Sequence, residues 1–287
     1  NELLIRPVTA GSATFLDVAA TVVPALEDLD VEYNNASPGI ALAAQSSIDS
    51  GNNVNWTFES GAQTNTWIGT SNQLWSVGAN WTLGRSPLPA DLMTVISNGT
   101  YDPIMPSAQF LAALDVNAGA VLYLNTNALT VGGSSVIAGT LSSVGSELVI
   151  FSNDLEISGS IDFAGSERLF LVGDLDMSSG TIDPVTSTVI IDGNSAQSVL
   201  FNGQYFYNLI VSNTDALVTF AGAVTSEFYR SESADVTYSN DFTATDCRIY
   251  SENGAITQKF GAGSTYTFAE LYVNGSLGKT QHLESTS

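Results

Sequence analysis

Three short stretches in the middle of the chain repeat one pattern: Leu129–Gly133 (LTVGG), Leu155–Gly159 (LEISG) and Leu175–Gly180 (LDMSSG). In each of them two apolar residues flank a more polar one, and a glycine-containing turn follows. This alternation places both apolar side chains on the same face of a strand. The starting positions of the stretches fit a repeat of roughly 20–25 residues, which is typical of solenoid coils. The pattern therefore predicts a parallel β-helix, or β-solenoid.

The rest of the chain agrees with an all-β fold. Alternating runs separated by Gly, Ser and Asn continue from residue 107 to residue 273. Seven of the eight prolines lie in the first 106 residues, and only Pro184 follows them. Because proline removes a backbone donor from a β-ladder, the long proline-poor part predicts a sheet that continues through many strands. A β-sandwich is the alternative, since hairpin-type pairs such as Asn98-Gly99 and Asp192-Gly193 also occur.

The segment 61–106 has a different composition from the rest. All four tryptophans lie between residues 56 and 81, and prolines follow them up to Pro106. A solenoid must cover its end coil to prevent edge pairing, and aromatic, non-repeating sequence suits that task. We expect Trp56, Trp67, Trp75 and Trp81 to pack in a cap or junction. The alternative is that these rings form a platform on which sugar rings stack.

The charge balance excludes some partners. The chain has 29 acidic and 7 basic residues, a net charge of -22, and only 13% charged residues in total. Seven cations cannot form the basic surface that binds nucleic acid or an anionic membrane, and the chain has no apolar run long enough to span a bilayer. A surface of Ser, Thr, Asn and Gly suits an extracellular or cell-surface protein. The single cysteine, Cys247, has no partner for a disulfide and is expected in the core.

Several motifs carry a resemblance to a family. They are Asp49–Phe58 (DSGNNVNWTF), Thr66–Gly69 (TWIG), Leu74–Trp81 (LWSVGANW), Ser187–Gly193 (STVIIDG), Phe206–Ile210 (FYNLI) and Gly263–Phe268 (GSTYTF). The chain resembles the repeat units of very large secreted bacterial surface proteins of the adhesin or autotransporter-passenger type. The resemblance implies a right-handed β-solenoid and assigns no catalytic residue.

The resemblance also implies an order of segments. Residues 1–60 match the closing coils of a unit, residues 61–106 its cap or junction, and residues 107–287 its main solenoid. Because a closing segment precedes an opening one, we expect the chain to be one period of a tandem array or of a head-to-tail surface fibre. Its partners would then be neighbouring copies of itself, with surface glycans as candidate ligands. The alternative is a boundary near residue 60 between unrelated neighbours.

Residues with catalytic or metal-binding chemistry are few. The only histidine, His282, is expected in a loop, and no Ser/His/Asp triad can be built around it. We therefore predict that the protein is not an enzyme and carries no cofactor, with calcium as the exception. Oxygen-bearing side chains suit Ca²⁺, and the candidate ligands are Asp49, Asn53, Asp154, Glu156, Asp174 and Asp176.

The alternative function uses some of these carboxylates for catalysis. Alternation puts Asp154 with Glu156, and Asp174 with Asp176, on an outward face, where coil stacking would bring the two pairs together. A polysaccharide lyase or a glycosidase could use such carboxylates, with Arg168 as the nearest base for a lyase. A carbohydrate-binding adhesin is intermediate between this enzyme and the structural unit.

Five asparagines begin Asn-x-Ser/Thr sequons and are candidate glycosylation sites. They are Asn35, Asn55, Asn80, Asn98 and Asn274.

Overall fold

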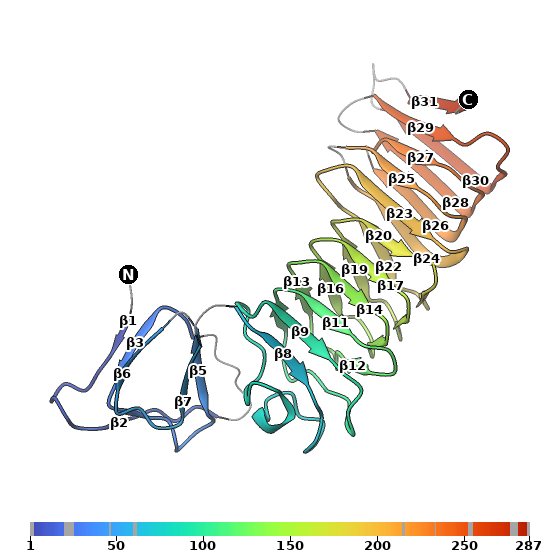
Figure 1. Cartoon of the computed structure of the whole chain (residues 1–287). Coiled ribbons are helices and arrows are strands. Elements are labelled where there is room, and N and C mark those ends of the chain that lie inside the picture. The colour runs from blue at the N-terminus through green and yellow to red at the C-terminus, as the bar shows by residue number, and fades with distance from the viewer. Residues whose placement is uncertain are drawn as a thin grey trace.

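The structure is a computed structural model that describes residues 3–19, 26–45, 47–59, 62–213, 216–232, 234–251, 255–275 and 281–285. Nearly all of its regular structure is β, and the strands stack in parallel as a β-solenoid of about 12 turns (Figure 1). Within the described residues, the short 3-10 helix η1 (Gly78–Asn80) is the one helical element. The predicted all-β solenoid is confirmed.

Three sheets run along the long part of the solenoid. The first has eleven strands: β8 (Thr64–Trp67), β9 (Met93–Ile96), β11 (Leu114–Val116), β14 (Ser135–Ile137), β17 (Leu155–Ile157), β20 (Leu175–Met177), β23 (Gln197–Phe201), β25 (Val218–Phe220), β27 (Val236–Tyr238), β29 (Ile256–Phe260) and β31 (Gln281–Ser285). The second has nine: β10 (Gln109–Leu111), β13 (Leu129–Val131), β16 (Leu148–Phe151), β19 (Arg168–Leu171), β22 (Thr188–Ile191), β24 (Gln204–Val211), β26 (Val224–Glu232), β28 (Phe242–Ser251) and β30 (Tyr266–Gly275). The third has four: β12 (Val121–Tyr123), β15 (Thr140–Ser142), β18 (Ser160–Asp162) and β21 (Thr181–Asp183).

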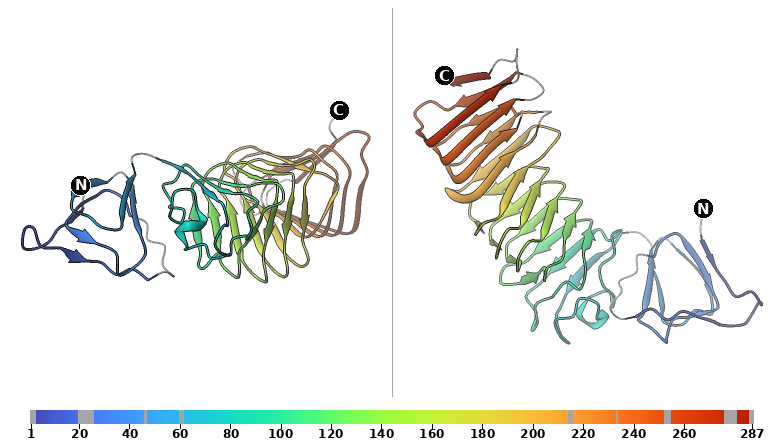
Figure 2. Two further views of the ribbon diagram at one scale, coloured as in Figure 1. Left: turned by 60° about the horizontal axis from the view of Figure 1, so that its bottom comes forward. Right: turned by 180° about the vertical axis from the view of Figure 1, so that it is seen from behind.

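Each early coil visits the three sheets in turn. Strand β14 of the eleven-stranded sheet leads to β15 of the four-stranded sheet, then to β16 of the nine-stranded sheet, and then to β17 one coil higher. From β24 onward, one long strand of 8 to 10 residues replaces the second and third strands of the coil. The solenoid therefore changes from three short sides to longer ones towards its C-terminal end (Figures 1 and 2).

Strand pairing is parallel in every sheet, which excludes the β-sandwich alternative. Leu155 pairs with Leu175, so the step between these two stretches is one coil. The Leu129–Gly133 stretch was wrongly placed in the same repeat as the other two. Leu129 lies on β13 in the nine-stranded sheet and pairs with Val149, so its separation from Leu155 is not a coil length. The same apolar alternation occurs on every side of the coil, and it cannot tell one side from another.

Apolar side chains form columns inside the coils. In the nine-stranded sheet the column begins Leu129, Val149, Leu169, Val189, Leu209, with a constant step in sequence from each member to the next. It continues through Tyr229, Cys247 and Leu271. All but Leu271 are buried, Cys247 included, as expected. Burying such columns stabilises the fold by about 1.5–3 kcal/mol for each large side chain.

Glycine allows the turns between sheets to stack closely. A Cβ atom on Gly159 would lie 2.0 Å from the carbonyl oxygen of Gly139 in the coil below. No side chain fits there, which explains the glycine in the repeated turn.

An N-terminal unit, residues 3–59, forms three small parallel sheets of its own. They are β1 (Leu3–Ile5) with β3 (Leu29–Glu32) and β6 (Ile48–Gly51), β2 (Thr14–Phe15) with β4 (Asn34–Asn35), and β5 (Leu42–Gln45) with β7 (Trp56–Glu59). In Figure 1 this unit is seen as a triangle, down its own coils, whereas the long solenoid is seen from the side. Strands β8 and β9 already belong to the eleven-stranded sheet, so the segment 61–106 contributes strands to the solenoid as well as its Trp-rich end. The domain boundaries at residues 60 and 106 and the hand of the coil stay predictions.

Candidate functional site

The tryptophans predicted to form a cap separate into two places. Trp67, Trp75 and Trp81 are buried and lie together, with the Trp81 ring edge-on to Trp67 at 5.1 Å and to Trp75 at 4.7 Å between centroids. Trp56 lies instead in the N-terminal unit, stacked on Phe58 at 5.9 Å. The three buried rings have no exposed face on which a sugar could stack, so they do not form the alternative platform.

Asn80 fixes the loop that surrounds these rings. Its side chain is fully buried; its Oδ1 accepts the backbone N–H of Ser71 at 2.9 Å, and its Nδ2 donates to Asn72 Oδ1 at 3.0 Å and to the Leu74 carbonyl at 3.1 Å. A glycan on Asn80 is therefore incompatible with the folded protein. The other sequon asparagines are exposed or half-buried: Asn35, Asn55, Asn98 and Asn274.

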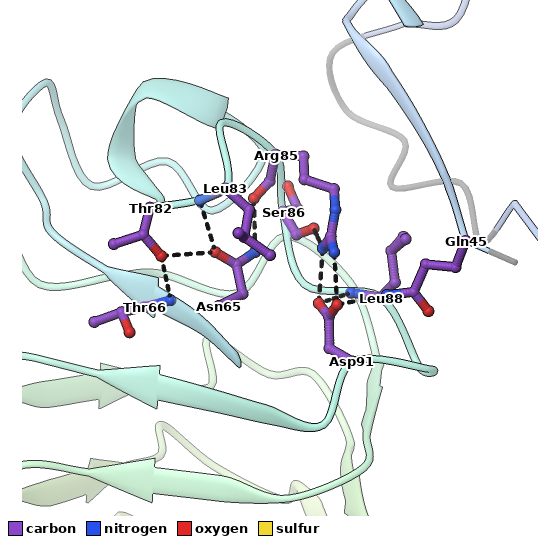
Figure 3. Close-up of polar contacts among 9 residues, drawn as sticks. All are labelled: Gln45, Asn65, Thr66, Thr82, Leu83, Arg85, Ser86, Leu88 and Asp91. Carbon is purple, nitrogen blue, oxygen red and sulfur yellow. Dashed lines mark hydrogen bonds and ion pairs between the residues drawn. The ribbon is translucent and has the colours of Figure 1, made fainter. Parts of the chain in front are cut away.

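A buried ion pair lies beside the Trp-rich end, where the N-terminal unit meets the solenoid (Figure 3). The Arg85 guanidinium donates from Nη1 to Asp91 Oδ2 at 2.7 Å and from Nη2 to Asp91 Oδ1 at 2.6 Å. The Leu88 backbone N–H donates to the same carboxylate at 2.8 Å. Gln45, on β5 of the N-terminal unit, donates from Nε2 to Asp91 Oδ1 at 2.6 Å. One carboxylate therefore joins the two parts of the chain. Its partners Arg85 and Leu88 line a cavity of about 340 Å³.

Asn65 ties this junction to the first strand of the solenoid. Its buried side chain donates from Nδ2 to the Arg85 carbonyl at 2.9 Å, and its Oδ1 accepts the Leu83 backbone N–H at 3.3 Å (Figure 3). Sequence reasoning missed this junction. A signal was present, because Arg85 is the only basic residue between Arg6 and Arg168. An isolated arginine in such a charge-poor stretch indicates a specific partner.

The acidic pairs lie together on the outward face of the eleven-stranded sheet, as the alternation predicted. Glu156 pairs in register with Asp176, and Asp154 Oδ1 accepts the Asp174 backbone N–H at 3.0 Å. With Asp115 they line an open groove of about 550 Å³. Burial raises the pKa of the Asp115 carboxyl above its usual range, although the Val136 backbone N–H opposes the shift.

This acidic groove does not assemble the other predicted groups. In the described part of the chain, no three acidic, cysteine or histidine side chains converge to hold a metal ion. Arg168, the candidate lyase base, lies on the nine-stranded sheet with its guanidinium 4.9 Å from the Phe170 ring centroid, on a different side of the coil. The only histidine, His282, lies on strand β31 and not in a loop.

At the second candidate calcium site, the side chains of Asp49 and Asn53 form hydrogen bonds within the N-terminal unit. Asp49 Oδ1 accepts the Gly51 backbone N–H at 2.9 Å and the Asn53 Nδ2 at 2.7 Å. Asn53 Oδ1 accepts the Asn34 backbone N–H at 3.0 Å. These two side chains shape the turn.

Both ends of the chain expose side chains that face the inside of the coil. On β30, Leu271 and Val273 continue the buried columns of Cys247 and Ile249 but are 47% and 40% exposed. On β1, Leu3 pairs with the buried Leu29 and is 65% exposed. Leu3, Leu271 and Val273 are therefore inward-facing apolar side chains that the described residues leave partly exposed.

Comparisons with protein-family models, with curated proteins and with solved structures give no match to this chain. Among the described residues, no helix has the length and apolar character that a transmembrane segment needs.

Proposed function

We propose that this chain is an extracellular structural or adhesive β-solenoid unit that continues head to tail with further copies, as one period of a tandem array or one link of a surface fibre. The observation that carries the proposal is the open coil interior at β30, where Leu271 and Val273 are uncovered. Apolar surface of this kind is stabilised when another coil covers it.

The geometry of the two ends suits such a continuation. The strands are parallel throughout, so β30 has its free edge towards the next coil and β1 has its free edge towards the preceding one. The last coil step leads from Cys247 to Leu271 and the first from Leu3 to Leu29, so the coils at the two ends are of similar length. A contact between two different ends does not close on itself, and it therefore generates a filament.

The surface supports an extracellular, repeated role. A net charge of -22 keeps neighbouring copies soluble, and the exposed Asp154, Glu156, Asp174 and Asp176 belong to that surface. The sequence motifs described above add the resemblance to secreted surface proteins.

Sedimentation velocity and negative-stain electron microscopy of the purified chain test the proposal. We expect rods that lengthen with protein concentration, and we expect Leu271→Glu to abolish them by placing a charge on the open interior. Thr267→Glu is the matched control, because Thr267 is an exposed residue of the same strand that pairs with the exposed Thr243 and faces outward. Monomers at every concentration, or equal loss in both variants, would contradict the head-to-tail arrangement.

A carbohydrate-active enzyme is the second candidate, and the acidic groove favours it. A raised pKa is typical of a general acid, and Asp115 shares the groove with Glu156 and Asp176. Release of reducing ends from a polysaccharide, lost in Asp115→Asn, would replace the structural function with this one.

A further inference from the structure

The outward face of the nine-stranded sheet contains a shallow depression that the proposed function does not use. It has a volume of about 340 Å³ and lies over β24, β26 and β28. We call it the Arg–aromatic face, and its outward side chains are Asn208, Phe228, Arg230, Asp246, Arg248 and Tyr250. Because these side chains project from paired strands of a continuous sheet, their positions are fixed before any ligand arrives.

Two arginines of this face lie over aromatic rings. The Arg230 guanidinium lies 5.1 Å from the centroid of the Tyr250 ring, and that of Arg248 lies 5.4 Å from the Tyr272 ring one coil further on. Arg248 also bonds the Asp246 carboxylate twice, from Nε at 2.9 Å and from Nη2 at 2.6 Å. A stacked and bidentate guanidinium loses little further freedom when it binds a ligand.

Both guanidinium charges are already balanced on the protein. Arg248 is paired with Asp246, and Arg230 forms an ion pair with Glu232 on the same strand. An anionic ligand would have to compete with these carboxylates, on a protein whose net charge is -22. The face is therefore suited to an uncharged ligand that takes hydrogen bonds from fixed polar groups.

Apolar surface lies within the same depression. The Phe228 side chain is 40% exposed although it projects from the middle of a strand, and its ring is held edge-on by Tyr207 at 5.3 Å between centroids. Ile210 lines the depression beside it. Exposed aromatic and aliphatic surface enclosed by Asn, Asp and Arg side chains matches a pyranose ring, which has an apolar C–H face and a rim of hydroxyl groups.

We infer that the Arg–aromatic face binds an uncharged glycan, with a sugar ring against Phe228 and its hydroxyls towards Asn208, Asp246 and the arginines. The face extends along the coils, since Arg230, Arg248 and Tyr272 are in register on successive strands. Successive coils are about 4.8 Å apart, so one chain of sugars can contact several coils along the axis. This inference rests on the adhesive part of the proposed function and names its ligand class.

Titration calorimetry with defined hexasaccharides tests the inference. The probes are cellohexaose, laminarihexaose and mannohexaose as uncharged glycans, with hexagalacturonate as the charged one. We expect at least one uncharged probe to bind, and Phe228→Ala to weaken that binding about tenfold, as is usual for an aromatic anchor. Phe110→Ala is the matched control, because Phe110 is a 52% exposed phenylalanine on β10 at the other end of the same sheet. It is expected to leave the affinity unchanged within about twofold.

Three results would overturn the inference: no binding of any uncharged probe at millimolar concentration, binding of hexagalacturonate alone, or equal weakening by the two phenylalanine variants. The same titration on Leu271→Glu separates this inference from the head-to-tail arrangement. If that variant binds the glycan with wild-type affinity, glycan recognition does not depend on assembly. If the wild-type chain assembles but binds no probe, only the glycan inference fails.

Discussion

The two ends of the long solenoid are finished in opposite ways. At the β8 end, Trp67, Trp75 and Trp81 fill the coil interior and the buried Arg85–Asp91 pair lies beside them. At the other end the alternating pattern continues through β30, the last strand of the nine-stranded sheet, and Leu271 remains exposed. Filling the interior of an end coil takes large side chains outside the repeating pattern. An ordinary coil needs only the repeating alternation of apolar and polar residues.

The two ends of the long solenoid should differ in how readily they pair with another coil. A closed end with buried charges resists pairing, and an open end with an apolar interior favours it. The irregular sequence is therefore concentrated in the junction at the β8 end of the long solenoid. Variants at the two ends should differ both in stability and in association.

The largest effect is expected at the closed end. Asp91→Ala removes the carboxylate that Arg85 and Gln45 share and so breaks a buried, bidentate ion pair, which costs about 3–5 kcal/mol. Urea unfolding followed by tryptophan fluorescence measures this loss where the tryptophans lie.

Two further variants make that measurement specific. Arg85→Met with Asp91→Leu removes both charges and should recover most of the lost free energy of unfolding. Asp176→Ala, in the exposed acidic groove, should change it by no more than about 0.5 kcal/mol. A loss in Asp91→Ala as small as that of Asp176→Ala would mean that the buried pair does not stabilise this end.

Two leucines of the same core column, Leu209 and Leu271, allow the stability contribution of the interior to be compared with that of the β30 end. Leu209 is fully buried between Val189 and Tyr229, so Leu209→Ala should cost about 2–5 kcal/mol of unfolding free energy. Leu271→Ala in the same column should cost less than about 1 kcal/mol when the protein is dilute, because the side chain is half exposed. Urea midpoints of the two variants, measured below the concentration at which rods form, give the contrast. Equal losses would show that the β30 end is covered in the isolated chain.

Near the open end the core gains a polar network. Tyr238 and Tyr229 share a hydrogen bond of 2.7 Å between their hydroxyls, and Tyr238 donates to Gln258 Oε1 at 2.8 Å. Both tyrosines are buried, which raises the pKa of each hydroxyl. Tyr238→Phe leaves the Tyr229 hydroxyl and the Gln258 amide without this partner and should cost about 1–3 kcal/mol.

Thermal unfolding of Tyr238→Phe measures the cost, with Tyr205→Phe as the control because Tyr205 is an exposed tyrosine of the nine-stranded sheet, which also contains Tyr229. A Tyr238→Phe protein as stable as the control would contradict the network.

The solenoid could be predicted from residues such as Leu155 and Leu175, because alternation and a constant coil length are local properties. The sheet to which each of these residues belongs could not be predicted, since Leu129 shows the same alternation on another side of the coil. The exposure of Leu271 could not be predicted either, because its sequence context is that of a buried residue. Partners far apart in sequence, such as Gln45 and Asp91, depend on how two coil stacks meet, and alternation carries no information on that.

The turn before β16 was also missed, although its sequence repeats. Val144–Glu147 (VGSE) and Ala164–Glu167 (AGSE) precede paired strands one coil apart, and both glutamates are buried. Each carboxylate accepts the backbone N–H groups of its own turn, at 2.8 Å from Val144 to Glu147 and at 2.9 Å from Ala164 to Glu167. A glutamate in an alternating sequence resembles a solvated residue, and only the position of the turn amides reveals its role.

The smallest effect on the free energy of unfolding is expected when Glu147 of this turn loses its charge, by mutation or by a fall in pH. Burial opposes ionisation of Glu147, but the N–H groups of Val144, Thr126 and Gly145 outweigh it and lower the pKa of the carboxyl. Because the pKa is lower in the folded protein, the carboxylate contributes its full stability above the unfolded value of about 4.3 and loses it as the pH falls through the folded value. Glu147→Gln keeps the shape but not the charge, so it should cost about 1 kcal/mol at pH 7, and this difference should shrink as the pH falls below about 4.3. Urea midpoints between pH 7 and pH 3 test this, with Glu156→Gln, at an exposed glutamate, as the control variant. If the gap between wild type and Glu147→Gln stayed constant down to pH 3, the turn would be held by shape, and the charge on Glu147 would not stabilise the coil.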